Sequence, residues 1–170
     1  MKMVLKIVGV IVALVMVALI VLSITGLDPD QRRAGLWLKG EVRPFPSDWS
    51  FAGESGTIMV ETHPWYLIPH SVTVSFMTYE GNLYLHVDYG PPMYAPGTFP
   101  SGKSWTAAVG RNPKVRIKVG NQVFDGKAFL IADKAESDAI FEVYRQKRPQ
   151  DPYNDYALRD NVYFLRVLPD

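Results

Sequence analysis

The amino-acid sequence predicts a mainly β domain of the α+β class, with six antiparallel strands and one main flanking helix, behind an N-terminal transmembrane helix. Three observations lead to this prediction. Apolar and polar residues alternate through 71–89 and again through 115–132, and each stretch is interrupted by a Gly-Asn pair. Residues 133–147 instead carry apolar side chains at helical spacing. Residues 3–24 are apolar almost throughout.

The apolar N-terminal segment predicts an anchor in the lipid bilayer. Residues 3–24 are interrupted only by Lys6, Gly9 and Ser23. As a helix they rise about 33 Å, which matches the hydrocarbon core of a membrane. A cleaved signal peptide is the alternative, but the apolar run exceeds a usual signal segment and residues 22–26 lack a small-x-small cleavage site. We expect an uncleaved anchor over 1–26, a tether and irregular segment over 27–55, and the β domain over 56–170.

Basic residues flank this segment on both sides and bear on its orientation. Lys2 and Lys6 favour a cytoplasmic N-terminus, whereas Arg32 and Arg33 follow the apolar run closely. A short basic tail rarely crosses a membrane. We therefore expect a single-pass membrane protein whose β domain is extracytoplasmic.

Charge and cysteine content exclude several classes of function. Lys2 and Lys6 account for two of the 18 basic residues, so 16 remain in the rest of the chain against 17 acidic ones. A domain without net positive charge is a poor partner for nucleic acid, and we expect none. The sequence has no cysteine, which excludes disulfides, thiolate metal sites and a cysteine nucleophile.

The tether segment is rich in proline, glycine and charge, yet it holds more aromatic residues than a solvated linker would. We expect these aromatic side chains to pack onto the domain: Trp37, Phe45, Trp49 and Phe51.

The strand pattern predicts specific pairings. A short strand is expected over 57–62, and a closing strand over 162–168. With Gly81-Asn82 as a two-residue turn, the first hairpin pairs Phe76 with Val87, Ser75 with Asp88 and Met77 with His86. With Gly120-Asn121 as the turn, the second pairs Arg116 with Asp125 and Ile117 with Phe124.

The main helix begins at a capping signal. Asp133 stands three residues before Glu136, which is the spacing of a capping box, and the helix is expected to run to about Lys147. Its predicted apolar stripe consists of Ala135, Ala139, Ile140, Val143 and Tyr144.

The stretch between Tyr89 and Phe124 contains five basic residues and no acidic one, so it is a candidate anion site. Lys103, Ser104 and Arg111 supply two cations and a hydroxyl, which suit a phosphate group through charge-assisted hydrogen bonds. A basic loop that simply faces water is the alternative. Arg116 and Lys118 are expected on the outer face of a strand, with Arg116 paired to Asp125.

Residues 102–105 (Gly-Lys-Ser-Trp) and 111–117 (Arg-Asn-Pro-Lys-Val-Arg-Ile), set between two hairpins and an Asp-initiated helix, resemble the flavin-binding split-barrel superfamily. That superfamily includes pyridoxamine-phosphate oxidases and deazaflavin-dependent nitroreductases. The resemblance implies a six-stranded antiparallel split β-barrel, and FMN or a deazaflavin bound at the interface of a homodimer. It also implies that Lys103, Ser104 and Arg111 hold the cofactor phosphate. Trp105 can stack on the flavin ring or belong to the core.

The three histidines complete the candidate residues. His63 and His70 are separated by two prolines at a spacing that matches no metal site, so no metal is expected. His70 begins a strand near the expected mouth of the barrel, where it can contact a flavin or act as acid or base. A hydrogen-bonded histidine at a strand end is the alternative. Two functions stay open: a membrane-anchored flavin- or deazaflavin-dependent oxidoreductase of unknown substrate, and a non-catalytic split-barrel binding module.

Overall fold

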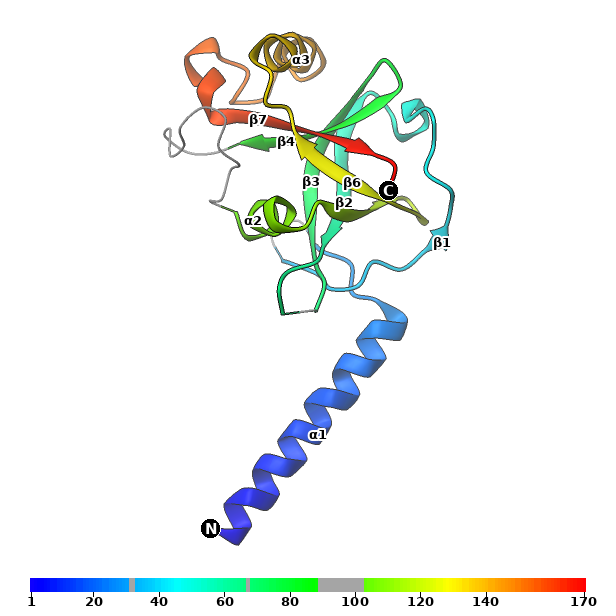
Figure 1. Cartoon of the computed structure of the whole chain (residues 1–170), viewed down its shortest axis with the longest axis vertical. Coiled ribbons are helices and arrows are strands. Elements are labelled where there is room, and N and C mark those ends of the chain that lie inside the picture. Colours follow the sequence, from blue (N-terminus) through cyan, green and yellow to red (C-terminus); the bar gives the residue numbers. More distant parts are fainter. Residues whose placement is uncertain (31–32, 67, 89–102) are drawn as a thin grey trace.

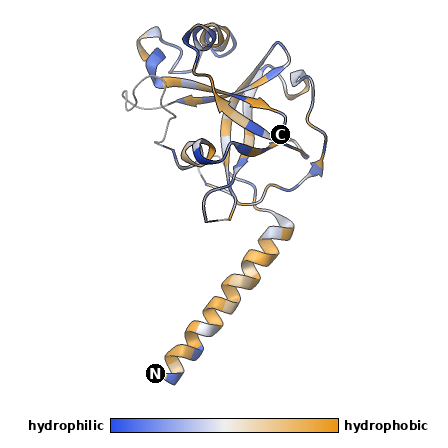
Figure 2. Ribbon diagram, in the orientation of Figure 1, coloured by the Kyte–Doolittle hydropathy of each residue, from blue (hydrophilic) through white to orange (hydrophobic). Residues whose placement is uncertain are grey.

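The computed structural model describes residues 1–30, 33–66, 68–88 and 103–170. It consists of a long N-terminal helix, α1 (Lys2–Thr25), and a domain built around a closed β-barrel (Figure 1). None of the residues of α1 is buried, and its mean hydropathy reaches 3.3. Figure 2 shows that the ribbon of this helix is coloured as hydrophobic along almost its whole length. By length and composition α1 can cross a membrane, since an amphipathic surface helix would show a polar face.

Six antiparallel strands close the barrel, as the sequence predicted. They are β2 (Ser55–Thr62), β3 (His70–Tyr79), β4 (Asn82–Asp88), β5 (Lys114–Val119), β6 (Gln122–Leu130) and β7 (Val162–Leu168). The order around the barrel is β6-β5-β2-β3-β4-β7, and pairing of β7 with the second half of β6 closes it. A two-residue strand, β1 (Glu41–Val42), runs parallel to the first half of β6.

Two tryptophans fill opposite ends of the barrel. The turn end is the end that holds the β3–β4 and β5–β6 turns, and Trp49 lies there, 1% exposed, in ring contact with Phe124. The opposite end holds Thr62 and His70 and is covered by α2 (Ser104–Arg111), so we call it the α2 end. Trp105 of α2 is 6% exposed and packs in the same apolar core as Trp49. The barrel interior is therefore a packed core.

The first hairpin differs from the predicted register by two residues. Its turn is Glu80-Gly81, both with positive φ (49° and 74°), rather than Gly81-Asn82. Phe76 consequently faces Leu85, while Ser75 faces His86 and Met77 faces Tyr84. A turn with two positive φ angles matches the twist of the flanking strands and accepts glycine at its second central position. The sequence alone did not show whether Gly81 occupies the first or the second central position. A shift of two residues leaves every side chain on its predicted face.

The second hairpin has the predicted register. Its turn is Gly120-Asn121, with φ of 58° at Gly120, and Arg116 faces Asp125 while Ile117 faces Phe124. Here glycine occupies the first central position of the turn, which is the arrangement that the prediction assumed.

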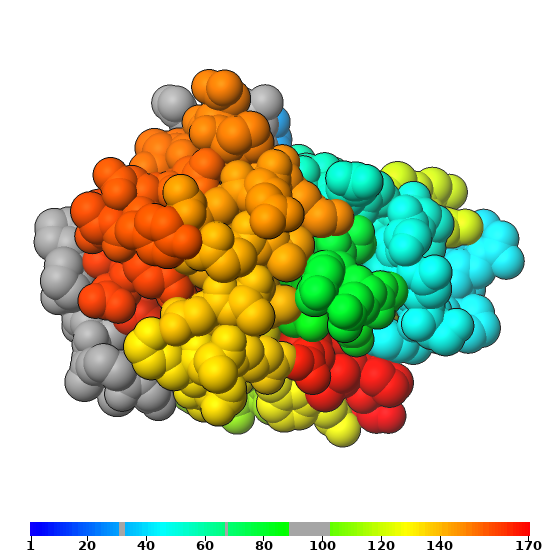
Figure 3. Space-filling view, turned by 90° about the horizontal axis from the view of Figure 1, so that it is seen from above, coloured from blue at the N-terminus to red at the C-terminus, as the bar shows by residue number. Residues whose placement is uncertain are grey.

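Helix α3 (Lys134–Lys147) covers the outer face of β3, β4 and β7 and forms much of the surface in Figure 3. Asp133 caps it as predicted, because its Oδ1 accepts a hydrogen bond from the Glu136 backbone N–H at 2.8 Å. The predicted stripe is partly wrong. Ile140 and Tyr144 are buried, but Ala135 and Ala139 are exposed and Phe141 is buried in their place. Burying the larger phenyl ring removes more apolar area from water.

The segment between α1 and β2 packs on the domain. Trp49 is buried, Phe45 packs against it, and the ring of Phe51 stacks on it in a short 3₁₀ turn (Ser50–Ala52). Leu38 is fully buried, and Trp37 is half-buried. The prediction that these aromatic residues lie on the domain is thus supported most strongly at Trp49.

Candidate functional site

Helix α2 begins without a capping side chain. Its N-cap residue, Lys103, is extended and makes no side-chain capping bond, and the first turn contains no acidic residue. The hydroxyl of Thr106 turns back to the Lys103 carbonyl at 2.8 Å. The exposed Ser104 begins the helix. Since the first turn of a helix presents backbone N–H groups and the positive end of its dipole, this position favours an anion.

The fold brings all five predicted site residues to the α2 end of the barrel. Lys103, Ser104, Trp105 and Arg111 belong to α2 or its N-cap. His70 opens β3, and strand pairing joins it to the same end, because Thr62 faces both His70 and Val115 at the start of β5. Residues separated by more than 30 positions in sequence therefore share one end of the barrel.

These residues differ in exposure. Ser104 and Arg111 are exposed, Lys103 is partly exposed, and His70 is half-buried. Burial lowers the pKa of His70, so its neutral form is favoured. Trp105, in contrast, packs within the barrel core, which is the alternative that the sequence left open for it.

Acidic residues from elsewhere in the chain neutralise most of the basic stretch. Four of its five cations form ion pairs: Lys103 with Asp88 at 3.4 Å, Lys114 with Asp170 at 3.5 Å, Arg116 with Asp125 at 2.7 Å, and Lys118 with Asp28. Within the described part of the chain, Arg111 is joined by no ion pair. The positive character of the α2 end therefore rests on Arg111 and the start of the helix more than on the whole stretch.

His86, which the sequence analysis did not single out as a site, lies on the outer face of β4 beneath α3. It is 4% exposed, and its ring lies 4.5 Å from that of Tyr144. Among the described residues, neither of its ring nitrogens has a hydrogen-bond partner. Burial lowers the pKa of His86 to about 4, and the nearby Arg148 and Lys103 act in the same direction. Asp88 and Asp151 oppose this shift. The only sequence signal was its place beside Asp88 on the outward-facing side of an alternating strand.

The phenol of Tyr144 shares this environment. Burial raises the pKa of Tyr144, and the negative charge of Asp151 adds to the effect. Its hydroxyl has no hydrogen bond of normal geometry to any described residue, so we attribute the influence of Asp151 to proximity of charge rather than to a hydrogen bond.

Glu61 is a second buried ionisable residue that the sequence did not reveal. It is 3% exposed, and its Oε2 accepts a hydrogen bond from the Leu38 backbone N–H at 2.6 Å. Burial raises the pKa of Glu61, against the Leu38 hydrogen bond and the positive charge of Arg116. Its position fixes the segment after α1 onto the outer face of β2.

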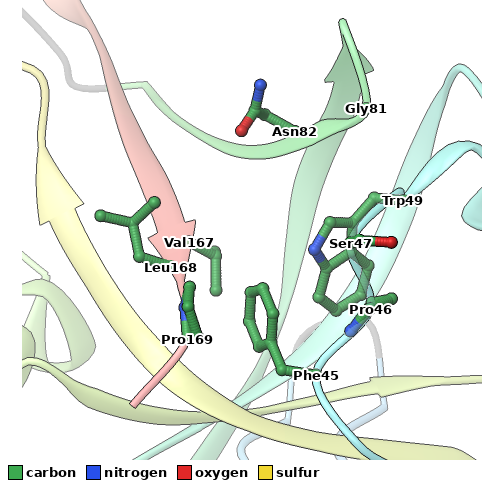
Figure 4. A pocket seen from close by; sticks show the side chains of 9 residues that line it. All are labelled: Phe45, Pro46, Ser47, Trp49, Gly81, Asn82, Val167, Leu168 and Pro169. Atoms are coloured by element: carbon green, nitrogen blue, oxygen red, sulfur yellow. The ribbon is translucent and has the colours of Figure 1, made fainter.

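A cavity of about 340 Å³ lies at the turn end of the barrel (Figure 4). Its lining is mostly apolar: Phe45, Pro46, Ser47, Trp49, Gly81, Asn82, Val167, Leu168 and Pro169. A second cavity, of about 180 Å³, lies between β2 and β5 near the β5–β6 turn. Neither is lined by any of the five predicted site residues. The described residues contain no group of three or more His, Asp or Glu side chains arranged for a metal.

Comparison with known proteins finds likeness in solved structures alone. No family model matches the chain, and no curated protein matches it. A protein from Bacteroides thetaiotaomicron described as a 5-nitroimidazole antibiotic resistance protein is 17% identical, over 69% of this chain and 74% of that one, with a TM-score of 0.48. One from Listeria innocua described as a pyridoxamine 5′-phosphate oxidase is 17% identical, over 68% and 85%, with a TM-score of 0.44. The heme storage protein HutZ from Vibrio cholerae is 14% identical, over 71% and 86%, with a TM-score of 0.49.

The solved structures that this chain resembles include one described as a pyridoxamine 5′-phosphate oxidase, which is the kind of protein that the sequence resemblance named. The chain itself has the closed six-stranded antiparallel barrel that the resemblance implied. At these identities and TM-scores, the ligands named for the neighbours are not transferred to this chain.

Proposed function

We propose that this protein is a membrane-anchored oxidoreductase that binds FMN or a deazaflavin at the α2 end of its barrel. The observation that carries the proposal is the uncapped start of α2, where Lys103 and the exposed Ser104 adjoin backbone N–H groups with no acidic residue in the first turn. This donor set fits a phosphate group. The cofactor would supply the redox chemistry, while the protein binds and orients it.

Arg111 has a separate role in this proposal. It ends α2, seven residues after Ser104, so the two lie about 10 Å apart along the helix axis. Arg111 therefore lies at the opposite end of the helix from the backbone N–H groups of its first turn. We therefore assign Lys103 and Ser104 to the cofactor phosphate, and Arg111 to a second polar or acidic part of the cofactor or substrate. His70, neutral at physiological pH, would contact the flavin or act as acid or base at the same barrel end.

The remaining parts of the proposal concern assembly and location. α1 would cross the bilayer through residues 3–24, with the β domain on the extracytoplasmic side. Two copies would form a homodimer, and the exposed Ser104 and Arg111 leave this end of the barrel open to a second copy. A cofactor at such an interface is what the split-barrel resemblance implies.

The proposal is tested by titrating FMN, and separately a deazaflavin, into the purified full chain in detergent while following flavin fluorescence. Lys103→Ala should weaken binding of the phosphate-bearing cofactor by about tenfold or more, because a charge-assisted hydrogen bond contributes about 1.5–3 kcal/mol. Lys134→Ala is the matched control: it removes the same charge from an exposed site on α3. Equal affinity of Lys103→Ala and parent would remove Lys103 from the site, and a parent that binds neither cofactor would overturn the proposal.

A second function, a binding module without catalysis, is favoured by one observation. Asp88 already pairs with Lys103, and acids from outside the basic stretch pair with Lys114, Arg116 and Lys118. Such neutralisation gives the basic residues a structural role that requires no cofactor. Purified protein without a flavin absorbance spectrum, and without affinity in the titration, would support this function.

A further inference from the structure

The connection between β2 and β3 exposes two aromatic side chains to solvent. Trp65 is 80% exposed and Tyr66 is 48% exposed, and their rings meet edge to face with centroids 5.7 Å apart. Among the described residues beyond α1, Trp65 is the most exposed of the large apolar side chains. A tryptophan buries a large apolar area when it is covered, so two adjacent exposed aromatic rings mark a surface that meets a partner.

The geometry of this connection is held from both sides. Pro64 and Pro69 restrict the backbone before and after the aromatic pair. At its base, the Thr62 hydroxyl donates a hydrogen bond to the His70 carbonyl at 3.1 Å, and the two residues pair as the last rung between β2 and β3. The aromatic pair is thus presented on a narrow, closed projection from the α2 end of the barrel.

The chain leaving α1 is bound to the strand that follows this projection. Leu27, two residues after the end of α1, donates its backbone N–H to the Trp37 carbonyl at 3.1 Å. Gly35 and Ser71 then exchange two backbone hydrogen bonds, of 2.9 and 3.0 Å, and Ser71 is next to His70. The ion pair of Asp28 with Lys118 adds a further attachment to β5. Little free chain therefore separates the helix from the barrel.

As a consequence, α1 and the β2–β3 connection lie on one side of the domain. Figure 1 shows the connection projecting on the side from which α1 departs, near the level of the last turns of the helix. If α1 crosses a bilayer, the connection reaches the headgroup region of that bilayer. Tryptophan and tyrosine are the residues enriched at this depth, because their rings are apolar while the indole N–H and phenol O–H remain hydrated.

We propose that Trp65 and Tyr66 form a second membrane contact, inserting into the interfacial region of the bilayer that α1 crosses. This inference rests on the membrane anchoring in the proposed function. The contact would stop rotation of the domain about the short attachment to α1. It would also turn the α2 end of the barrel, with His70 and the proposed cofactor site, toward the membrane surface.

The test uses the full chain in phosphatidylcholine vesicles whose acyl chains carry bromine near the glycerol end, which quenches only tryptophan emission within the bilayer. The sequence has four tryptophans, two of them in the barrel core. We expect bromolipid quenching in the parent and loss of most of it in Trp65→Phe. The matched control Trp37→Phe, which removes the half-buried tryptophan near α1, should keep it.

Flotation of the same vesicles distinguishes membrane anchoring by α1 from membrane contact by Trp65 and Tyr66. If the full chain fails to float with the lipid, the anchor and the aromatic contact are both overturned. If it floats but Trp65→Phe and parent are quenched equally, the aromatic contact alone is overturned. The cofactor titration in detergent is independent of both outcomes.

Discussion

His86 shows how a single residue acquires its properties from packing. The side chain lies on the outer face of β4, between the ring of Tyr144 at 4.5 Å and that of Phe164 at 5.9 Å. An imidazolium in this position would lose its hydration without gaining a hydrogen bond from the described part of the chain, where neither nitrogen has a partner. The neutral form is therefore the one that folding favours.

We predict that His86 makes the protein less stable in mild acid. Its pKa is about 4 in the folded state and 6.5 ordinarily, so the unfolded chain binds more protons between these values. The free energy of unfolding should fall as the pH falls from 6.5 to 4, by up to about 3 kcal/mol from this residue. Urea unfolding at pH 7 and pH 4.5 measures the difference, which His86→Phe should reduce.

Other titrating groups also contribute to the pH dependence of unfolding, so parent and His86→Phe must be compared. Glu61, whose pKa is raised, affects the free energy of unfolding in the opposite direction. Its folded state binds the extra proton as the pH falls, so its contribution to stability rises in acid. The contributions of carboxylates with lowered pKa, such as Asp138, are the same in parent and variant. An unchanged pH dependence in His86→Phe would show that this histidine is not the source.

At the scale of elements, the segment between α1 and β2 is more than a connection. Leu38 is fully buried, Trp49 fills the turn end of the barrel, and β1 pairs with β6. The Leu38 N–H also satisfies the buried carboxylate of Glu61. Residues 27–55 therefore contribute both core and hydrogen bonds to the barrel, although their sequence is rich in proline, glycine and charge.

We predict that residues 27–170 fold without α1, whereas residues 56–170 do not. Loss of Trp49 alone should cost about 3–5 kcal/mol, which is a large part of the stability of an ordinary domain. Thermal unfolding followed by circular dichroism should show a cooperative transition for the longer chain and none for the shorter one. Trp49→Ala in the longer chain is the graded control. A cooperative transition of equal midpoint in 56–170 would mean that the segment is dispensable.

At the scale of the whole molecule, the arrangement is a barrel held close to an apolar helix. α1 has no buried residue, and its ribbon is hydrophobic along almost its whole length (Figure 2). The chain after it is bound to β3 within ten residues of the helix end, through Gly35 and Ser71. The domain therefore stays near whatever surrounds α1, which in our proposal is a bilayer.

We predict that a reporter fused after Asp170 lies outside the cytoplasm. Lys2 and Lys6 favour a cytoplasmic N-terminus, and one crossing then exports the domain. Alkaline phosphatase, which is active only after export, should be active in the fusion, whereas a fluorescent protein that needs the cytoplasm should be dark. Replacing Lys2 and Lys6 by Gln should weaken this preference, because Arg32 and Arg33 then carry the remaining charge. The reverse pattern of reporters would place the barrel in the cytoplasm.

Features that depend on residues close together in the chain could be predicted from the sequence. The alternation in β3 to β6, the Asp133 cap of α3 and the apolar length of α1 all follow from side chains within a few positions of one another. The register of the second hairpin followed for the same reason, since Gly120 stands where its turn needs a positive φ. The register of the first hairpin was predicted wrongly, because its turn consists of Glu80 and Gly81 rather than Gly81 and Asn82.

The pairing and the burial of the charged residues, in contrast, could not be predicted from the sequence. Asp88, Asp125, Asp170 and Asp28 neutralise cations that look unopposed in the chain, and they do so from outside the basic stretch. Likewise, the alternation of β4 placed His86 outward, but only the docking of α3 buried it. The physical reason is that electrostatic and burial energies depend on distance in space, whereas a residue pattern reports only distance along the chain.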